Sequence, residues 1–290
     1  GNVTFDSTVN TLASTNANPT LAKSLTVSTA GATTFNGAVG LATDGALNSL
    51  TTTAASGATA GTVTFNQGQV TTTGNQNYGG AVLLGINTTL EAGAGNVTFD
   101  STVNTLASTN ANPTLAKSLT VSTAGATTFN GAVGLATDGA LSSLTTTAAT
   151  GATAGTVTFN QGQVTTTGNQ NYGGAVLLGA DTTLNAGTGN VTFDSTVNTL
   201  ASTNANPTLA KSLTVSTAGA TTFNGAVGLA TDGALNSLTT TAASGATAGT
   251  VTFNQGQVTT TGNQNYGGAV LLGINTTLEA GAGNVTFDST

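Results

Sequence analysis

Short segments in which apolar and polar residues alternate recur along the chain. Four of them near the N-terminus each begin with Leu or Val: 25–27, 50–52, 70–72 and 90–92. Four others each end in an aromatic residue: 33–35, 63–65, 76–78 and 97–99. Because successive side chains of a strand point to opposite sides, we expect Val63 and Phe65 to face inward and Thr64 outward. The pattern predicts short strands, since no 3.6-residue period persists and Gly, Thr and Asn disfavour helix interiors.

The whole sequence repeats with a period of 94 residues. Residues 1–94 recur at 95–188 and at 189–282, and a fourth copy begins at residue 283 and runs to 290. The first and third copies are identical, and the middle copy differs at six positions: Ser142, Thr150, Ala180, Asp181, Asn185 and Thr188. Repetition of this kind is typical of a solenoid, in which each unit stacks on its neighbour. We therefore expect one continuous body.

The strand spacing predicts about four coils in each repeat, each with three short strands. The aromatic side chains would stack in one interior column: Phe35, Phe65, Tyr78 and Phe99. The aliphatic side chains would stack in another: Leu25, Leu50, Val70 and Leu90. An alternative with three coils, keyed on the Thr-Phe pairs, leaves Tyr78 and Val82 without a role. The predicted fold class is all-β, a parallel β-helix (β-solenoid), with about twelve coils in a rod on the order of 60 Å long.

Turn residues mark the corners of the coils. The residues that follow the aromatic strands are Asn36, Asn66, Gly79 and Asp100. These types tolerate positive φ best, so we expect a bend at one shared corner. Residues 10–23 include a proline, which cannot donate to a strand ladder, and are predicted to loop out. Asp44 and Gly45 predict a further turn.

Composition narrows the function classes. Only 4% of the residues are charged, and Arg, His, Cys, Met and Trp are absent. Lys23, Lys117 and Lys211 are the only basic side chains, which excludes a nucleic-acid binder that neutralises phosphates. Without cysteine there is no disulfide or thiolate metal site. The longest apolar stretch, residues 81–84, is too short to span a bilayer.

Carboxylates offer the only candidates for catalysis. The acids of the first repeat are Asp6, Asp44 and Glu91. Copies of one residue would lie about four coils apart, on the order of 19 Å, so they cannot form the close pair that glycoside chemistry needs. No Gly-Gly-x-Gly-x-Asp repeat forms calcium-binding turns. We predict no enzyme activity, no catalytic residue, no metal site and no cofactor.

Rows of threonine give a second interpretation. If Leu50 and Thr52 face inward, Thr51 and Thr53 face outward, and we expect Thr71 to lie beside them one coil on, with Thr26 and Ser28 extending the row. A Thr-x-Thr array is similar to the ice-binding face of β-helical antifreeze proteins. Stacked threonine is also what an exposed parallel strand favours by propensity. Both interpretations stay open at this point.

Four sequence blocks resemble those of giant bacterial exoproteins of the filamentous-haemagglutinin type. The blocks are SLTVSTAG at 24–31, TFNGAVG at 34–40, VTTTGNQNYGGAVLLG at 70–85 and NTTLEAG at 87–93. The resemblance covers essentially the whole chain. It implies a secreted, right-handed parallel β-helix that forms a surface fibre, an adhesive stalk or a matrix component. No binding residue of that family carries over to a position here.

The leading functional hypothesis is a structural, non-enzymatic shaft of an extracellular bacterial fibre or surface adhesin. Near-identical repeats suit a spacer, because they deliver length. The alternative is a binding module that uses the Thr- and Asn-rich face for glycans or ice. Residues 283–290 repeat residues 1–8, so we expect an excerpt from a longer array or a subunit that stacks end to end on another copy. We also expect that copies of the chain associate side by side, and that glycans or cell surfaces are further binding partners.

Overall fold

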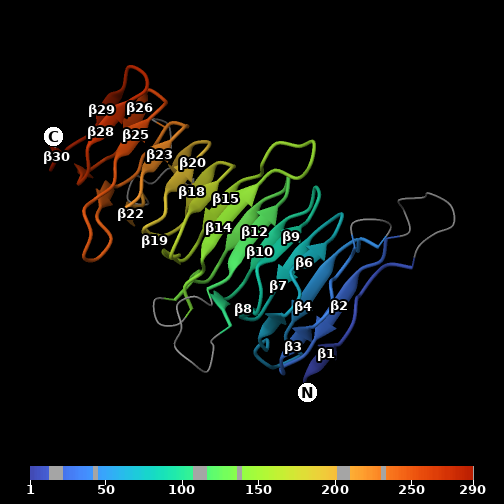
Figure 1. Ribbon diagram of the computed structural model, residues 1–290. Helices are drawn as coiled ribbons and strands as arrows, with labels where there is room; N and C mark the ends of the chain where they lie inside the picture. Colours follow the sequence, from blue (N-terminus) through green and yellow to red (C-terminus); the bar gives the residue numbers. More distant parts are fainter. Residues whose placement is uncertain are drawn as a thin grey trace. The chain divides into compact units, whose positions relative to one another are not determined.

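The computed structural model describes residues 1–12, 22–41, 45–106, 116–135, 139–200, 210–229 and 233–289. Within these ranges the chain forms thirty short strands and no helix (Figure 1). Neighbouring strands run parallel, as in the pairing of Val3 with Thr33. The predicted all-β class and the parallel β-solenoid are confirmed. Most of the predicted loop at 10–23, and Asp44 in the predicted turn, lie outside the described residues.

The strands belong to two compact units. Unit 1 consists of Gly1–Leu141 and Thr146–Gly155, and unit 2 consists of Ser142–Thr145 and Thr156–Thr290. Strands β1 to β13 lie in unit 1 and β15 to β30 in unit 2, while β14 (Ser143–Thr147) has residues in both.

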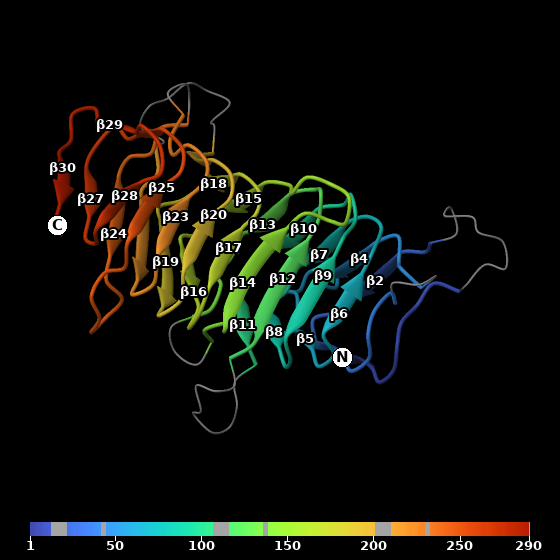
Figure 2. The ribbon, with the colours of Figure 1, turned by 45° about the horizontal axis from the view of Figure 1, so that its top comes forward.

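The strands of unit 1 pair into three parallel stacks. The first stack contains β1 (Val3–Phe5), β3 (Thr33–Phe35), β5 (Val63–Phe65), β8 (Val82–Leu84) and β11 (Val103–Thr105). The second stack contains β6 (Gln69–Thr71), β9 (Thr88–Glu91) and β12 (Ser118–Ser122), which lie side by side in Figure 2. The third stack contains β2 (Leu25–Ser28), β4 (Leu50–Thr53), β7 (Gln76–Tyr78), β10 (Val97–Phe99) and β13 (Thr127–Phe129).

One coil visits each stack once. The chain runs from β1 in the first stack to Val9, which bridges to Val39 and through it to Val70 of the second stack. It continues to β2 in the third stack and returns to the first stack at β3. Coil length varies, because Val63 pairs with Val82, 19 residues on, whereas Val39 pairs with Val70, 31 residues on.

A repeat does not contain a whole number of coils. From β1 the chain returns to the first stack at β3, β5 and β8, which makes three coils. Two further steps take it to β9 in the second stack and β10 in the third. Strand β10 is the copy of β1, 94 residues later. One repeat therefore spans three and two-thirds coils, close to the predicted value of about four, and each copy starts one-third of a coil out of phase.

In unit 2, too, equivalent strands of successive repeats are offset by part of a coil and lie in different stacks. One stack contains β17 (Gln170–Tyr172), β20 (Val191–Phe193), β23 (Thr221–Phe223), β25 (Val251–Phe253) and β28 (Val270–Leu272). Another contains β16 (Gln163–Thr165), β19 (Thr182–Gly187), β22 (Leu213–Thr217), β24 (Leu238–Thr241), β27 (Gln264–Tyr266) and β30 (Val285–Phe287). The remaining strands are β15 (Val157–Phe159), β18 (Val176–Leu178), β21 (Val197–Thr199), β26 (Gln257–Thr259) and β29 (Thr277–Glu279). Strand β30, the copy of β20, thus lies in a different stack from β20.

The predicted aliphatic column is wrong, because the number of coils per repeat is not whole. Leu25 pairs with Leu50 as expected, but the next partner of Leu50 is Gln76. Val70 and Leu90 pair with each other in the second stack. The prediction was wrong because it aligned strands by residue type. Which stack a strand joins is decided by the number of residues in each coil.

The aromatic column is confirmed as a chain of ring contacts, but it changes stacks. The ring of Phe35 lies 5.0 Å from that of Phe5 and 5.6 Å from that of Phe65, both stacked. Tyr78 meets Phe65 edge-on from the third stack at 5.6 Å and then stacks on Phe99 at 5.4 Å. The rings at 35, 65, 78 and 99 are fully buried. In unit 2 the rings of residues 253 and 266 make the same edge-on crossing.

Glycine forms one corner of the coils by close backbone approach. A Cβ atom on Gly61 would lie 1.8 Å from the carbonyl oxygen of Gly31, and one on Gly80 would lie 1.7 Å from that of Gly61. No side chain fits at these two positions. The predicted shared corner is wrong, because Asn36 and Asn66 follow strands of the first stack, whereas Gly79 and Asp100 follow strands of the third. The glycines with positive φ lie at other turns, such as Gly40 with φ of 64°.

Candidate functional site

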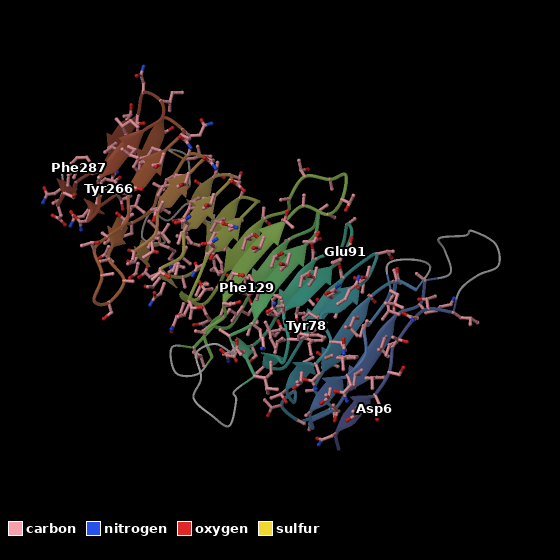
Figure 3. All side chains as sticks on the ribbon, in the orientation of Figure 1. Asp6, Tyr78, Glu91, Phe129, Tyr266 and Phe287 are labelled. Atoms are coloured by element: carbon pink, nitrogen blue, oxygen red, sulfur yellow. The ribbon has the colours of Figure 1, made fainter. Side chains whose placement is uncertain are left out.

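The described candidate acids of the first repeat, Asp6 and Glu91, lie well apart (Figure 3). Asp6 follows β1, whereas Glu91 ends β9 between Thr71 and Ser122 on the neighbouring strands. Asp44 and its copies at 138 and 232 lie outside the described residues. In the described ranges, no three His, Cys, Asp or Glu side chains gather where they could hold a metal ion.

A ladder of side-chain hydrogen bonds runs along the corner after the aromatic strands. Asn36 Nδ2 donates to Asp6 Oδ1 at 2.9 Å, and Asn66 Nδ2 donates to Asn36 Oδ1 at 2.8 Å. In unit 2 the same ladder, at 3.0 and 2.8 Å, contains Asp194, Asn224 and Asn254. Every amide donates toward the aspartate, and an ionised carboxylate only accepts hydrogen bonds. The ladder therefore explains both residue types at this corner and gives Asp6 a structural role.

Each repeat also buries a polar network that the sequence analysis missed. Tyr78 Oη donates to Gln76 Oε1 at 2.8 Å. Gln76 Nε2 donates to Thr72 Oγ1 at 3.2 Å and to the main-chain oxygen of Glu91 at 2.9 Å. The side chains of Thr72, Gln76 and Tyr78 are at most 2% exposed. The available signal was the Gln-x-Tyr spacing, which places both side chains on the inward side of one strand.

Burial determines the protonation of the tyrosines. The pKa of Tyr78 is raised well above its ordinary value of 10.0, because the buried phenolate would lose its hydration. The same cause raises the pKa of Tyr172 and of Tyr266. The three hydroxyl groups therefore remain protonated, and they act as hydrogen-bond donors inside the coil.

Thr52 differs from the hydrogen-bonded Thr72, because its buried hydroxyl group has no hydrogen-bond partner. The same holds for its copies Thr146 and Thr240. We expect Thr52→Val to raise the free energy of unfolding by about 1 kcal/mol, since it removes an unsatisfied polar group at nearly constant shape. The matched control is Thr72→Val, which deletes the partner of Gln76 and should destabilise by about 1–3 kcal/mol. Urea denaturation measures both. Shifts of the same sign would contradict the assignment of hydrogen bonds.

The predicted threonine row is partly wrong. Thr26 pairs with Thr51, and Ser28 with Thr53, as expected. Thr71, however, pairs with Glu91 in the second stack. The row in the third stack continues instead through three other outward residues: Asn77, Thr98 and Thr128. The row is two residues wide only on β2 and β4, and from β7 onward it is a single polar column rather than a Thr-x-Thr array.

The lysines are held through their main chain. The Lys23 N–H donates to Thr11 Oγ1 at 3.2 Å, and the Lys23 carbonyl accepts from the Asn48 N–H at 3.0 Å. The Lys117 N–H donates to Thr105 Oγ1 at 3.1 Å. Lys23 precedes the third-stack strand β2, whereas Lys117 precedes the second-stack strand β12. Equivalent cations in unit 1 therefore occupy different corners of the coil.

Together the strands and their pairings define a parallel β-solenoid with a 94-residue repeat. Comparisons of the chain with protein-family models, with curated proteins and with solved structures found no match. In the part of the chain that the structure describes, no helix is long and apolar enough to cross a membrane.

Proposed function

We propose that the chain is the structural, non-enzymatic shaft of an extracellular bacterial fibre or surface adhesin. The observation that carries this proposal is the continuous interior of each unit. In unit 1 the ring contacts pass from Phe5 through Tyr78 to Phe129, and they cross between stacks without a break. An interior of this kind continues for as long as repeats are added. The resemblance to filamentous-haemagglutinin-type exoproteins supports an extracellular location.

The rotation of the repeats also favours a shaft over a one-sided binding surface. Equivalent residues of successive repeats lie in different stacks, as Thr4 of β1 and Thr98 of β10 do. A feature repeated every 94 residues is therefore presented on successive sides of the coil. A flat array for a single partner would need its repeats on the same side.

A binding module for glycans or ice is the second candidate. The observation in its favour is the outward column in the third stack of unit 1: Thr26, Thr51, Asn77, Thr98 and Thr128. The column holds one polar residue per coil and includes an amide. Hydroxyl groups spaced along a strand stack could order water or bind sugar hydroxyls.

Self-association is the partnership that we propose for the shaft. Leu271, Leu272, Ile274 and Phe287 are more than half exposed in unit 2. In unit 1 the equivalent Leu84 and Phe99 are fully buried, because β11 and β13 cover them. The next coil of the solenoid, supplied by the same chain or by a second copy, would cover the exposed side chains. For the 290-residue chain on its own we propose end-to-end stacking of copies, and the low charge density permits lateral bundling.

The proposal is tested by electron microscopy of purified chains with three, six and nine repeats. We expect the length of single particles to rise by on the order of 18 Å per repeat, from three and two-thirds coils at about 4.8 Å each. All chains carry two substitutions that should suppress end-to-end stacking. In the three-repeat chain these are Leu272→Glu and Phe287→Glu, and in the longer chains they are made at the equivalent positions of the last coil. Particles that grow as compact globules would overturn the shaft. Ice recrystallisation inhibition or glycan retention that vanishes in Thr51→Tyr would instead favour the binding module.

A further inference from the structure

The dipeptide Asn-Gly occurs three times in the chain, at Asn36, Asn130 and Asn224. In all three, Nδ2 donates to the aspartate of the corner ladder. The glycine is required by the backbone, because a Cβ atom on Gly225 would lie 2.2 Å from the carbonyl carbon of Ser195. The middle position of the ladder therefore combines a hydrogen-bonded amide side chain with a glycine directly after it.

Asn-Gly is also the dipeptide in which asparagine cyclises most readily, since glycine has no side chain to hinder the approach. The glycine nitrogen loses its proton and attacks the asparagine Cγ. A new C–N bond forms, the side-chain amide leaves as ammonia, and a succinimide results. Water then opens the ring to aspartate or isoaspartate. The reaction requires the asparagine side chain to rotate until Cγ lies over the following nitrogen.

The ladder opposes that rotation from both sides. Asn224 Nδ2 donates to Asp194 Oδ1 at 3.0 Å, and Asn224 Oδ1 accepts from Asn254 Nδ2 at 2.8 Å. Rotation of the Asn224 side chain breaks both bonds, one of which is to a carboxylate and therefore among the stronger kind. Conversion to aspartate would also place two carboxylates in contact and prevent the ladder from closing again.

We propose that the Asp-Asn-Asn ladder protects the three Asn-Gly sites from succinimide formation, and that these asparagines become modification sites where the ladder opens. The inference does not depend on the function of the chain. It assigns the Asp residue of the corner a role in chemical durability in addition to its role in packing.

The test follows deamidation in the full 290-residue chain that carries Asp194→Ala, incubated at mildly alkaline pH. Trypsin cleaves after Lys23, Lys117 and Lys211, so the three sites fall in separate peptides, 24–117, 118–211 and 212–290, which differ in mass. Mass spectrometry reads each site. We expect Asn224 to deamidate about tenfold faster than in the parent chain, because the variant lacks the hydrogen bond to Asp194 that holds the Asn224 side chain in the ladder. Asn36 and Asn130 should keep the parent rate as internal controls.

Two further variants sharpen the result. Asn254→Ala removes the donor on the other side and should also accelerate Asn224 alone, whereas Asp194→Asn keeps an acceptor oxygen and should restore the parent rate. Two outcomes would overturn the proposal. One is an unchanged rate at Asn224 in both alanine variants. The other is equal acceleration at all three sites, which would assign the protection to the fold as a whole.

Discussion

Replacing Phe65 by alanine is expected to lower the free energy of unfolding of unit 1 by about 3–5 kcal/mol. Phe65 is fully buried, and its ring lies 5.6 Å from the rings of both Phe35 and Tyr78. It therefore occupies the point at which the ring contacts cross from the first stack to the third. Alanine would remove both contacts and leave a cavity between coils whose backbones are fixed by strand pairing. Urea denaturation followed by circular dichroism measures the loss.

The matched control is Thr34→Ala on the adjacent strand β3. Thr34 is only partly buried and points outward, so we expect a loss below about 1 kcal/mol. Thr64, the outward neighbour of Phe65 in sequence, is a less suitable control. It is only 9% exposed, because it lies between Thr34 and Leu83 on the paired strands. Equal losses in Phe65→Ala and Thr34→Ala would show that the inward and outward faces are assigned wrongly.

Strand alternation was sufficient to predict the fold class and the interior aromatic residues. The segments at 33–35, 63–65, 76–78 and 97–99 are all strands, and their aromatic side chains are all buried. A period of two is a local property, which short segments express without reference to their neighbours. The same argument assigned Thr26 and Thr51 to the outward side, and the two residues lie side by side on paired strands.

The phase of the coils could not be predicted from residue types. All three stacks are built from similar Val, Leu, Thr and Phe strands, so a strand does not reveal which stack it joins. The phase depends on the lengths of the turns, which vary from coil to coil. It was natural to assume a whole number of coils per repeat, and that assumption misplaced Val70, Thr71 and Leu90.

The polar features of the interior and the corner were hidden for a different reason. Gln76 is fully buried, although glutamine is mostly found at protein surfaces. Its burial is favourable only because Thr72, Tyr78 and the main chain satisfy its amide. Those partners are brought together by the register between coils. The ladder of Asp6 and Asn36 likewise joins residues 30 apart in sequence, which only the coil length makes neighbours.

Alkaline pH is expected to destabilise the protein through its buried tyrosines. The pKa of Tyr78 is raised in the folded state by burial, whereas in the unfolded chain it returns to about 10. Below pH 10 both states hold the proton, and the stability is fully present. Above pH 10 the unfolded state loses the proton and the folded state keeps it, so stability falls by about 1.4 kcal/mol per pH unit for each such tyrosine.

The effect is largest in unit 2, which contains Tyr172 and Tyr266, both with raised pKa. Above pH 10 we expect the stability of unit 2, with two such tyrosines, to fall about twice as steeply with pH as that of unit 1, with one. Urea denaturation at a series of pH values measures the slope. The control chain carries Tyr78→Phe, Tyr172→Phe and Tyr266→Phe. It loses the hydrogen bond to each glutamine, which lowers stability by a constant amount, but its slope above pH 10 should be nearly flat. A parent chain whose slope matches that of the control would show that the tyrosine hydroxyls ionise freely in the folded state, and that the coil interior is open to water at these positions.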